Sequence, residues 1–177
     1  MKSSIDISLA DFIYAVGVSA AFQRIDTPIV SLDNLLILIA FVTIIDDWVL
    51  YHIQAGQVTG ASRGAFAKSM VLDASVLLLW YCAAVTGAHG DVREFHIYLG
   101  LFYCATFAWE WVFAKTVGSA RMIPDLVCAC VFLLGAVLCD RAWYPYAAVL
   151  IALVWLAARR YAWARIVFNA DPTHAPG

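Results

Sequence analysis

The chain is poor in charged residues. Only 14% of its 177 residues are Asp, Glu, Lys or Arg, whereas 64% are hydrophobic, and the mean hydropathy is +0.82. A soluble globular domain carries about 25% charged residues and roughly 45–50% apolar ones. This composition excludes an ordinary soluble domain, and a net charge of −2 gives no support for nucleic-acid binding. We therefore expect an all-α membrane protein whose main partner is the lipid bilayer.

Motifs that carry enzyme or cofactor chemistry are also missing. The sequence contains no HExxH, no GxSxG and no acid pair of the GxGD kind, so no intramembrane hydrolase is indicated. His52 is expected inside the membrane and His89 and His96 near its outer surface, so no histidine pair is placed to hold a haem. We expect no catalytic site, no metal and no cofactor.

The five cysteines all lie inside apolar stretches. On a helix, the spacing of Cys128 and Cys130 directs their thiols to different faces, which disfavours a zinc site or a disulfide. We expect the cysteines to act as small buried residues.

Six apolar stretches, separated by glycine- and aspartate-containing turns, fill most of the chain. Each has about the 20 residues that an α-helix needs to cross a bilayer. We predict a single domain over residues 1–168 and a disordered tail at 169–177. The six predicted membrane spans are residues 7–24, 34–53, 67–88, 94–114, 123–139 and 143–168.

Basic residues are distributed unevenly between the two sides of the predicted bundle. One side has only Arg24, Arg93 and Arg141. The other collects Lys2, Arg63, Lys68, Lys115, Arg121, Arg159, Arg160 and Arg165. Basic loops stay in the cytoplasm, so both termini are expected there. A bare six-helix unit, rather than a doubled one, suits a bacterial inner membrane. Aromatic residues near the predicted helix ends are expected to anchor them at the membrane surfaces: Trp143 and Tyr144 on one side, Trp109 and Trp111 on the other.

Acidic residues and one histidine lie at a similar depth in the predicted spans. They are Asp11, Asp46, Asp47, His52 and Asp73, joined by Glu110 and Asp125. An ionised side chain in hydrocarbon costs at least ~2.5–3.5 kcal/mol, so such residues pair with one another or meet water. Asp46 and Asp47 are about 100° apart on a helix and cannot share one face. The layer is either a polar network that ties the helices together or part of a proton pathway.

The first predicted span carries a stripe that becomes more polar toward the outside. Its members, at i, i+4, i+7 and i+11 spacing, are Phe12, Val16, Ser19 and Gln23. The rest of this span is rich in small residues, which let neighbouring helices approach closely. The pattern is typical of a helix that lines a pore, and equally of the central helix of a bundle.

Two segments of the chain resemble a known family. The segment from Asp11 to Val18 reads DFIYAVGV, and the next span contains, in order, Phe41, Ile44, Trp48 and His52. Both resemble the first two helices of the transmembrane-protein-175 family, which comprises lysosomal potassium channels and their six-helix prokaryotic relatives. The family motif Phe-Ser-Asp is here Leu9-Ala10-Asp11, so the serine hydroxyl is missing.

The resemblance implies a homotetramer whose first helices line a central pore for potassium. In the family a ring of branched apolar side chains narrows the path, and the TVGYG filter of ordinary potassium channels is absent, as it is here. By position, Val16 would form the constriction and Ser19 would follow it. Asp11 would point away from the pore toward Trp48 and His52. We expect a potassium-permeable cation channel. It should be less selective than its relatives, because a ring of valine side chains is wider than the ring of isoleucine or leucine usual in the family.

Two other functions are compatible with the sequence. A proton-coupled transporter would use Asp11, Asp47, His52 and Asp73 as a relay, although the chain shows no internal repeat and no broken helix pair. A non-conducting membrane scaffold would share the fold without the pore, because a fold does not settle function.

Overall fold

The structure, a computed structural model, describes Ala15, Val18, Ser19 and Gln23 and the ranges 32–57, 63–113 and 122–170. These ranges hold the helices α2 (Leu32–Gln57), α3 (Arg63–Ala88), α4 (Val92–Phe113), α5 (Met122–Leu138) and α6 (Tyr144–Ala170). The predicted all-α class is confirmed for the described part of the chain. The first predicted span, beyond the single residues named, and the predicted tail from residue 171 onward lie outside the described residues.

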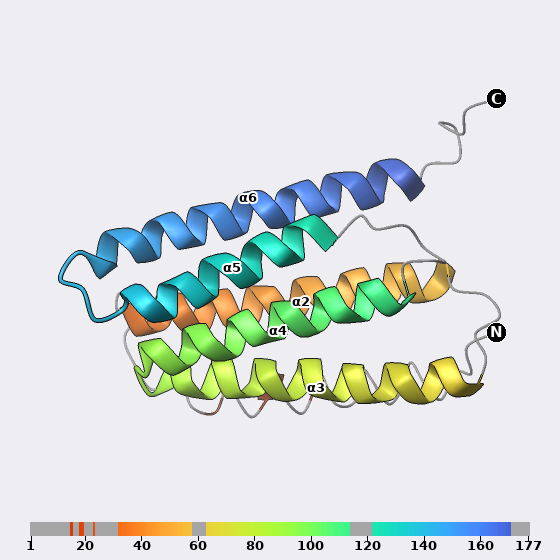
Figure 1. The fold of residues 1–177 in the computed structure, drawn as a ribbon, viewed down its shortest axis with the longest axis horizontal. Helices are drawn as coiled ribbons and strands as arrows, with labels where there is room; N and C mark the ends of the chain where they lie inside the picture. The colour runs from red at the N-terminus through yellow and green to blue at the C-terminus, as the bar shows by residue number, and fades with distance from the viewer. Residues whose placement is uncertain are drawn as a thin grey trace.

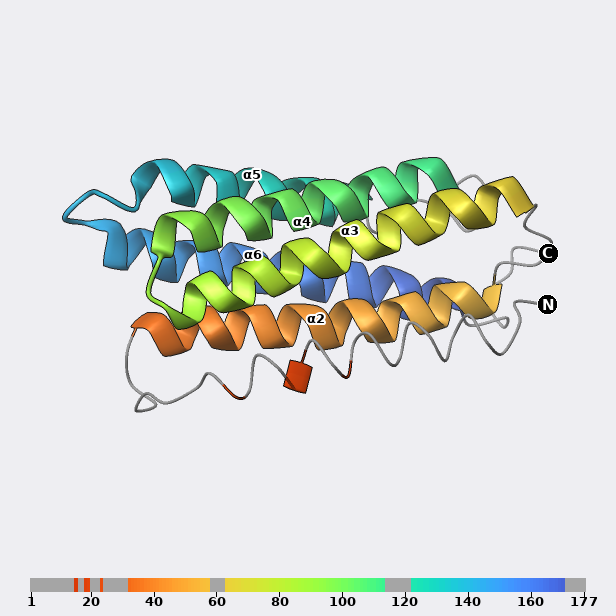
Figure 2. The same ribbon diagram turned by 90° about the horizontal axis from the view of Figure 1, so that it is seen from below.

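The five helices lie side by side, and each runs antiparallel to the next (Figures 1 and 2). The short connections favour this antiparallel arrangement, because a connection of a few residues is long enough to reverse the chain but too short to return it to the far end of the preceding helix. Between α3 and α4 the chain turns at Gly90, whose φ of 76° favours glycine, and the Asp91 amide donates to the Thr86 carbonyl at 2.9 Å. The α3–α4 and α5–α6 loops lie at the same end of the bundle, which we call the loop end (Figure 1).

Helix α4 is the centre of the bundle, since it packs most extensively against α3 and α5. Two glycines allow α4 and α5 to approach closely. A Cβ atom added to Gly100 would come within 2.8 Å of Leu133, and one added to Gly135 within 2.9 Å of His96. By contrast, α2 and α6 share few if any close backbone contacts. Their association depends on side chains that reach across the core.

The outer surface of the described helices is strongly apolar, with leucine, isoleucine and valine exposed on α2, α3, α5 and α6. Two stretches are long and apolar enough to cross a membrane: Val71–Ala88 in α3, with a mean hydropathy of 1.7, and Tyr144–Ala164 in α6, with 1.4. Only 33% of each stretch is buried, whereas the core helix of a soluble protein would be mostly buried. Helix α5 is also apolar but shorter.

Two expectations about individual side chains are wrong. Cys128 is buried as expected, but Cys104 and Cys130 are exposed, because α4 and α5 turn those positions outward. Tyr144 is not a surface anchor, since it is buried against His96 at the start of α6. Trp143, its neighbour, is exposed. In each case the rotation of the helix about its axis decides exposure, and apolar composition alone does not reveal that rotation.

Candidate functional site

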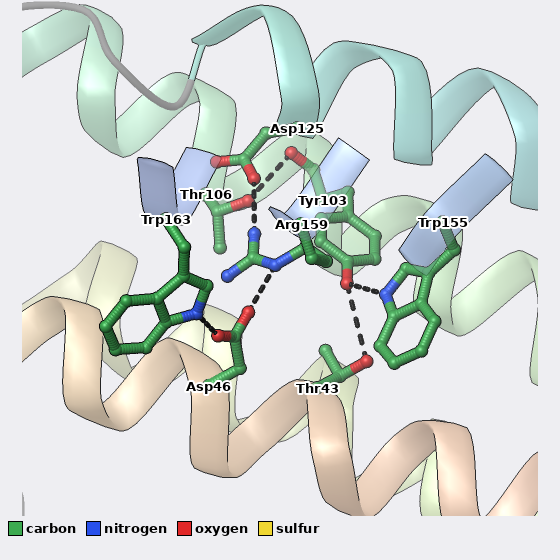
Figure 3. A network of polar contacts seen from close by, with 8 residues as sticks. All are labelled: Thr43, Asp46, Tyr103, Thr106, Asp125, Trp155, Arg159 and Trp163. Atoms are coloured by element: carbon green, nitrogen blue, oxygen red, sulfur yellow. Dashed lines mark hydrogen bonds and ion pairs between the residues drawn. The ribbon is translucent and has the colours of Figure 1, made fainter. Parts of the chain in front are cut away.

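The most elaborate polar site in the described residues surrounds Arg159 of α6 (Figure 3). This side chain is almost completely buried. Its Nη1 atom donates to Oδ1 of Asp125 on α5 at 3.0 Å, and its Nε atom donates to Oδ2 of Asp46 on α2. The indole N–H of Trp163 donates to the other oxygen, Oδ1, of Asp46. We call Asp46, Asp125, Arg159 and Trp163 the Arg159 cluster.

Local sequence explains how α6 supplies its part of the site. Trp155, Arg159 and Trp163 are spaced by four residues, so they lie one above another on a single helix face. On α5, Asp125 lies in the first turn, where the helix dipole favours a negative charge. Pro124 precedes it in the same turn, where a missing backbone N–H costs nothing.

Tyr103 of α4 extends the site toward the middle of the bundle. Its fully buried hydroxyl accepts a hydrogen bond from the Trp155 indole at 2.6 Å and lies 3.4 Å from Oγ1 of Thr43 on α2. The guanidinium carbon of Arg159 lies 5.8 Å from the centre of the Tyr103 ring, a cation–π distance. The hydroxyl of Thr106 donates to the Tyr103 carbonyl at 3.0 Å. The site therefore joins α2, α4, α5 and α6.

Further acids are buried in the described part of the bundle. Asp47 of α2 and Glu110 of α4 are nearly inaccessible to solvent, and Asp73 of α3 is partly buried.

A guanidinium keeps its proton under all ordinary conditions, so Arg159 supplies a fixed positive charge and cannot pass protons on. The chemistry that the Arg159 cluster supports best is the fastening of helices by charge-assisted hydrogen bonds.

The residues of the predicted polar network are described only in part, and the network stays a prediction. The side chains of Asp47, Trp48 and Asp73 are described, whereas Asp11 and the side chain of His52 lie outside the described residues. The observed contacts instead centre on Asp46 and Asp125, which belong to the predicted acidic layer, and on Arg159 and Trp163, which the sequence analysis did not identify as site residues. The sequence analysis places Arg159 among the cytoplasmic charges, but in the structure it is the counter-ion of Asp46 and Asp125. The spacing of Trp155, Arg159 and Trp163, taken with acids that need a partner, was the available signal.

Of the predicted pore-lining residues, Ser19 and Gln23 are described and both are exposed. The Gln23 amide donates to the Ser19 carbonyl at 3.2 Å, as in a helical turn. Val18, next to Ser19, instead packs against the main apolar core. Phe12 and Val16 lie outside the described residues.

The loop end contains a different set of polar contacts. Arg93 and Asp140 form an ion pair on the surface, and a hydrogen bond to Cys139, followed by the charge of Asp140, raises the pKa of Arg93. Beside them, Nε2 of the buried His96 is hydrogen-bonded to the Tyr144 hydroxyl. Among the described residues, no group of three or more His, Cys, Asp or Glu side chains is arranged to hold a metal.

The fold and the site define a class: an all-α bundle with an apolar outer surface, a buried charge cluster and two helices able to cross a membrane. No family model, curated protein or solved structure matches the chain, so its resemblance to the transmembrane-protein-175 family stays a prediction.

Proposed function

We propose that the chain is a multi-pass protein of the bacterial inner membrane with six helices and both termini in the cytoplasm. In this proposal it assembles as a homotetramer and forms a potassium-permeable cation channel. The first helix of each subunit lines the path, with an apolar constriction at Val16. The other lining residues are Phe12, Ser19 and Gln23.

The observation that carries this proposal is that residues of the first predicted span differ in their exposure. Val18 packs against the apolar core, whereas the polar side chains of Ser19 and Gln23 are exposed. Polar groups that leave a helix bundle within a membrane need water or another polar surface, because lipid offers no hydrogen bonds. A water-filled path between subunits meets that need.

The Arg159 cluster supports the same proposal from inside the bundle. A pore-lining helix needs neighbouring helices in defined positions, and charge-assisted hydrogen bonds between α2, α5 and α6 define those positions. A proton relay through the same site is disfavoured, because its central member, Arg159, does not give up its proton.

Potassium flux from liposomes that contain the purified protein tests the proposal. Val16→Asn should raise the basal flux, because a polar ring keeps the constriction hydrated. Val149→Asn is the matched control, since it makes the same chemical change on the exposed face of α6, and its flux should equal that of the wild type. If Val16→Asn and wild type conduct equally, Val16 is not in the path.

Thiol accessibility gives an independent check. Ser19→Cys should react with a charged, water-soluble thiol reagent, and the reaction should reduce flux. Val18→Cys, one position away, should not respond because Val18 packs against the core. The wild type accounts for the native thiols, including the exposed Cys104 and Cys130.

The two alternatives predict other results. Absence of flux from folded, oligomeric wild type and from Val16→Asn would favour a membrane scaffold. A proton-coupled transporter would show uptake that depends on a proton gradient. If Asp47 and Asp73 belong to a proton relay, replacing either by Asn would abolish uptake without reducing the amount of folded protein.

A further inference from the structure

Helices α2 and α6 are joined across the bundle by polar side chains, with few if any close backbone contacts between them. The most direct connection is Asp46, because both of its carboxylate oxygens accept hydrogen bonds from α6, one from Arg159 and one from Trp163. Figure 3 shows the carboxylate of Asp46 reaching from α2 toward these two donors. Asp46 therefore fastens α2 directly to α6 at this level.

The two acids of the cluster are not equivalent. The Asp125 side chain is 0% exposed and lies 3.0 Å from Arg159, whereas the Asp46 side chain is 11% exposed. If the Asp46 carboxylate moves away from Arg159, Arg159 keeps Asp125 as a counter-ion. The large penalty for an unpaired buried charge is then avoided, and the Asp46 carboxylate is the one already closest to the surface.

We propose that Asp46, Arg159 and Trp163 form a releasable latch between α2 and α6, and that Asp125 is the fixed partner that keeps Arg159 neutralised when the latch opens. Release lets α2 and α6 separate at the level of Asp46, while the Arg159–Asp125 bond holds α6 on α5. Asp46 is thus a positioning residue for the proposed channel. Any effect of latch opening on potassium flux rests on the proposed function. The separation of α2 from α6 does not.

The test measures the distance between α2 and α6 by pulsed electron paramagnetic resonance in the full-length protein in liposomes. Spin labels are attached through bio-orthogonal amino acids at Ile45 and Tyr161, both exposed, so that the native cysteines stay unlabelled. A second label pair, at Leu101 of α4 and Leu134 of α5, reports on the rest of the bundle.

Asp46→Asn removes the charge with little change in shape. We expect it to raise the population at longer α2–α6 distance about tenfold or more, because it replaces charge-assisted hydrogen bonds by weaker neutral ones. Asp125→Asn is the matched control: it removes the same charge from the fixed partner and should leave the α2–α6 distance at its wild-type value. The α4–α5 distance should not change in either variant.

Equal α2–α6 distances in wild type and Asp46→Asn would overturn the latch, as would the same lengthening in Asp46→Asn and Asp125→Asn. If Asp46→Asn does not fold, Trp163→Phe replaces it, because it removes one of the two α6 donors to Asp46 and leaves the Arg159–Asp125 pair intact. A wild-type distance in Trp163→Phe overturns the latch, and a longer one supports it. Longer distances without any potassium flux would retain the latch and reject the channel.

Discussion

The bundle holds arginine–aspartate ion pairs in opposite surroundings, at the loop end and, farther along the helices, in the Arg159 cluster. At the loop end, the side chains of Arg93 and Asp140 are 57% and 68% exposed. In the Arg159 cluster, the arginine side chain is 5% exposed and its two acids 11% and 0%. The same chemical groups therefore meet water at the loop end and packed helices in the interior of the bundle.

Surroundings decide what each pair does. A surface pair gains little because water already solvates both charges and salt screens them. A buried pair need not stabilise the fold relative to apolar residues, but each member becomes necessary once the other is present, because a lone buried charge is costly. The Arg159 cluster therefore specifies how α2, α5 and α6 are arranged, and the Arg93–Asp140 pair does not have that role.

Replacing Arg159 should produce the largest effect on this comparison. Arg159→Leu leaves Asp46 and Asp125 without their cation, and we expect it to destabilise the protein by about 3–5 kcal/mol. Arg160→Leu is the matched control, because Arg160 is the next residue on α6 and is exposed. Thermal unfolding in detergent and the yield of monodisperse protein measure both variants. Similar losses from the two substitutions would contradict the role given to the cluster.

Gly135→Ala tests whether a buried contact near the loop end contributes more to stability than the exposed ion pair there. The new Cβ atom would come within 2.9 Å of the buried His96 ring, and we expect overpacking to cost about 1–3 kcal/mol in thermal unfolding. Val137→Ala, on the exposed face of the same helix, should have a much smaller effect. If Gly135→Ala is as stable as the wild type, α4 and α5 separate more easily than their packing indicates.

Tyr103→Phe removes one hydroxyl from the edge of the Arg159 site. The Trp155 indole then loses its acceptor at 2.6 Å, and we expect a loss of about 1 kcal/mol in the same unfolding measurement. Thr43→Val should cost less, because the Thr43 hydroxyl lies at the longer distance of 3.4 Å from Tyr103. A larger loss of stability from Thr43→Val than from Tyr103→Phe would mean that the contact of Thr43 on α2 matters more than the Tyr103–Trp155 hydrogen bond to α6.

Much of the secondary structure was predictable, because long apolar stretches bounded by turn residues determine where helices form. Each described helix overlaps one predicted span, although α3 begins at Arg63 rather than at residue 67. The burial of Asp47 was also predictable, since it lies deep in an apolar stretch, whereas Asp125 is buried although it lies in the first turn of α5.

The partners of those acids were not predictable in the same way. Asp46 and Arg159 are 113 residues apart in the chain, and His96 and Tyr144 are 48 apart, so only the packing of helices brings them together. Counting basic residues by side assigned Arg159 to the cytoplasmic surface, because a count contains no information about which way a helix face points. The exposure of Cys104 and the burial of Tyr144 were mispredicted for the same physical reason.

Neutralising the surface pair should have the smallest effect and completes the comparison. Both members of the Arg93–Asp140 pair are hydrated, so Arg93→Gln should leave the unfolding temperature within experimental error, and added salt should remove any difference that exists at low ionic strength. Arg159→Gln, measured beside it, should stay destabilised at every salt concentration, because ions do not reach a buried cluster. A salt-dependent loss at Arg159 would show that water penetrates the bundle at Asp46, and the contrast between the two pairs would then be one of degree.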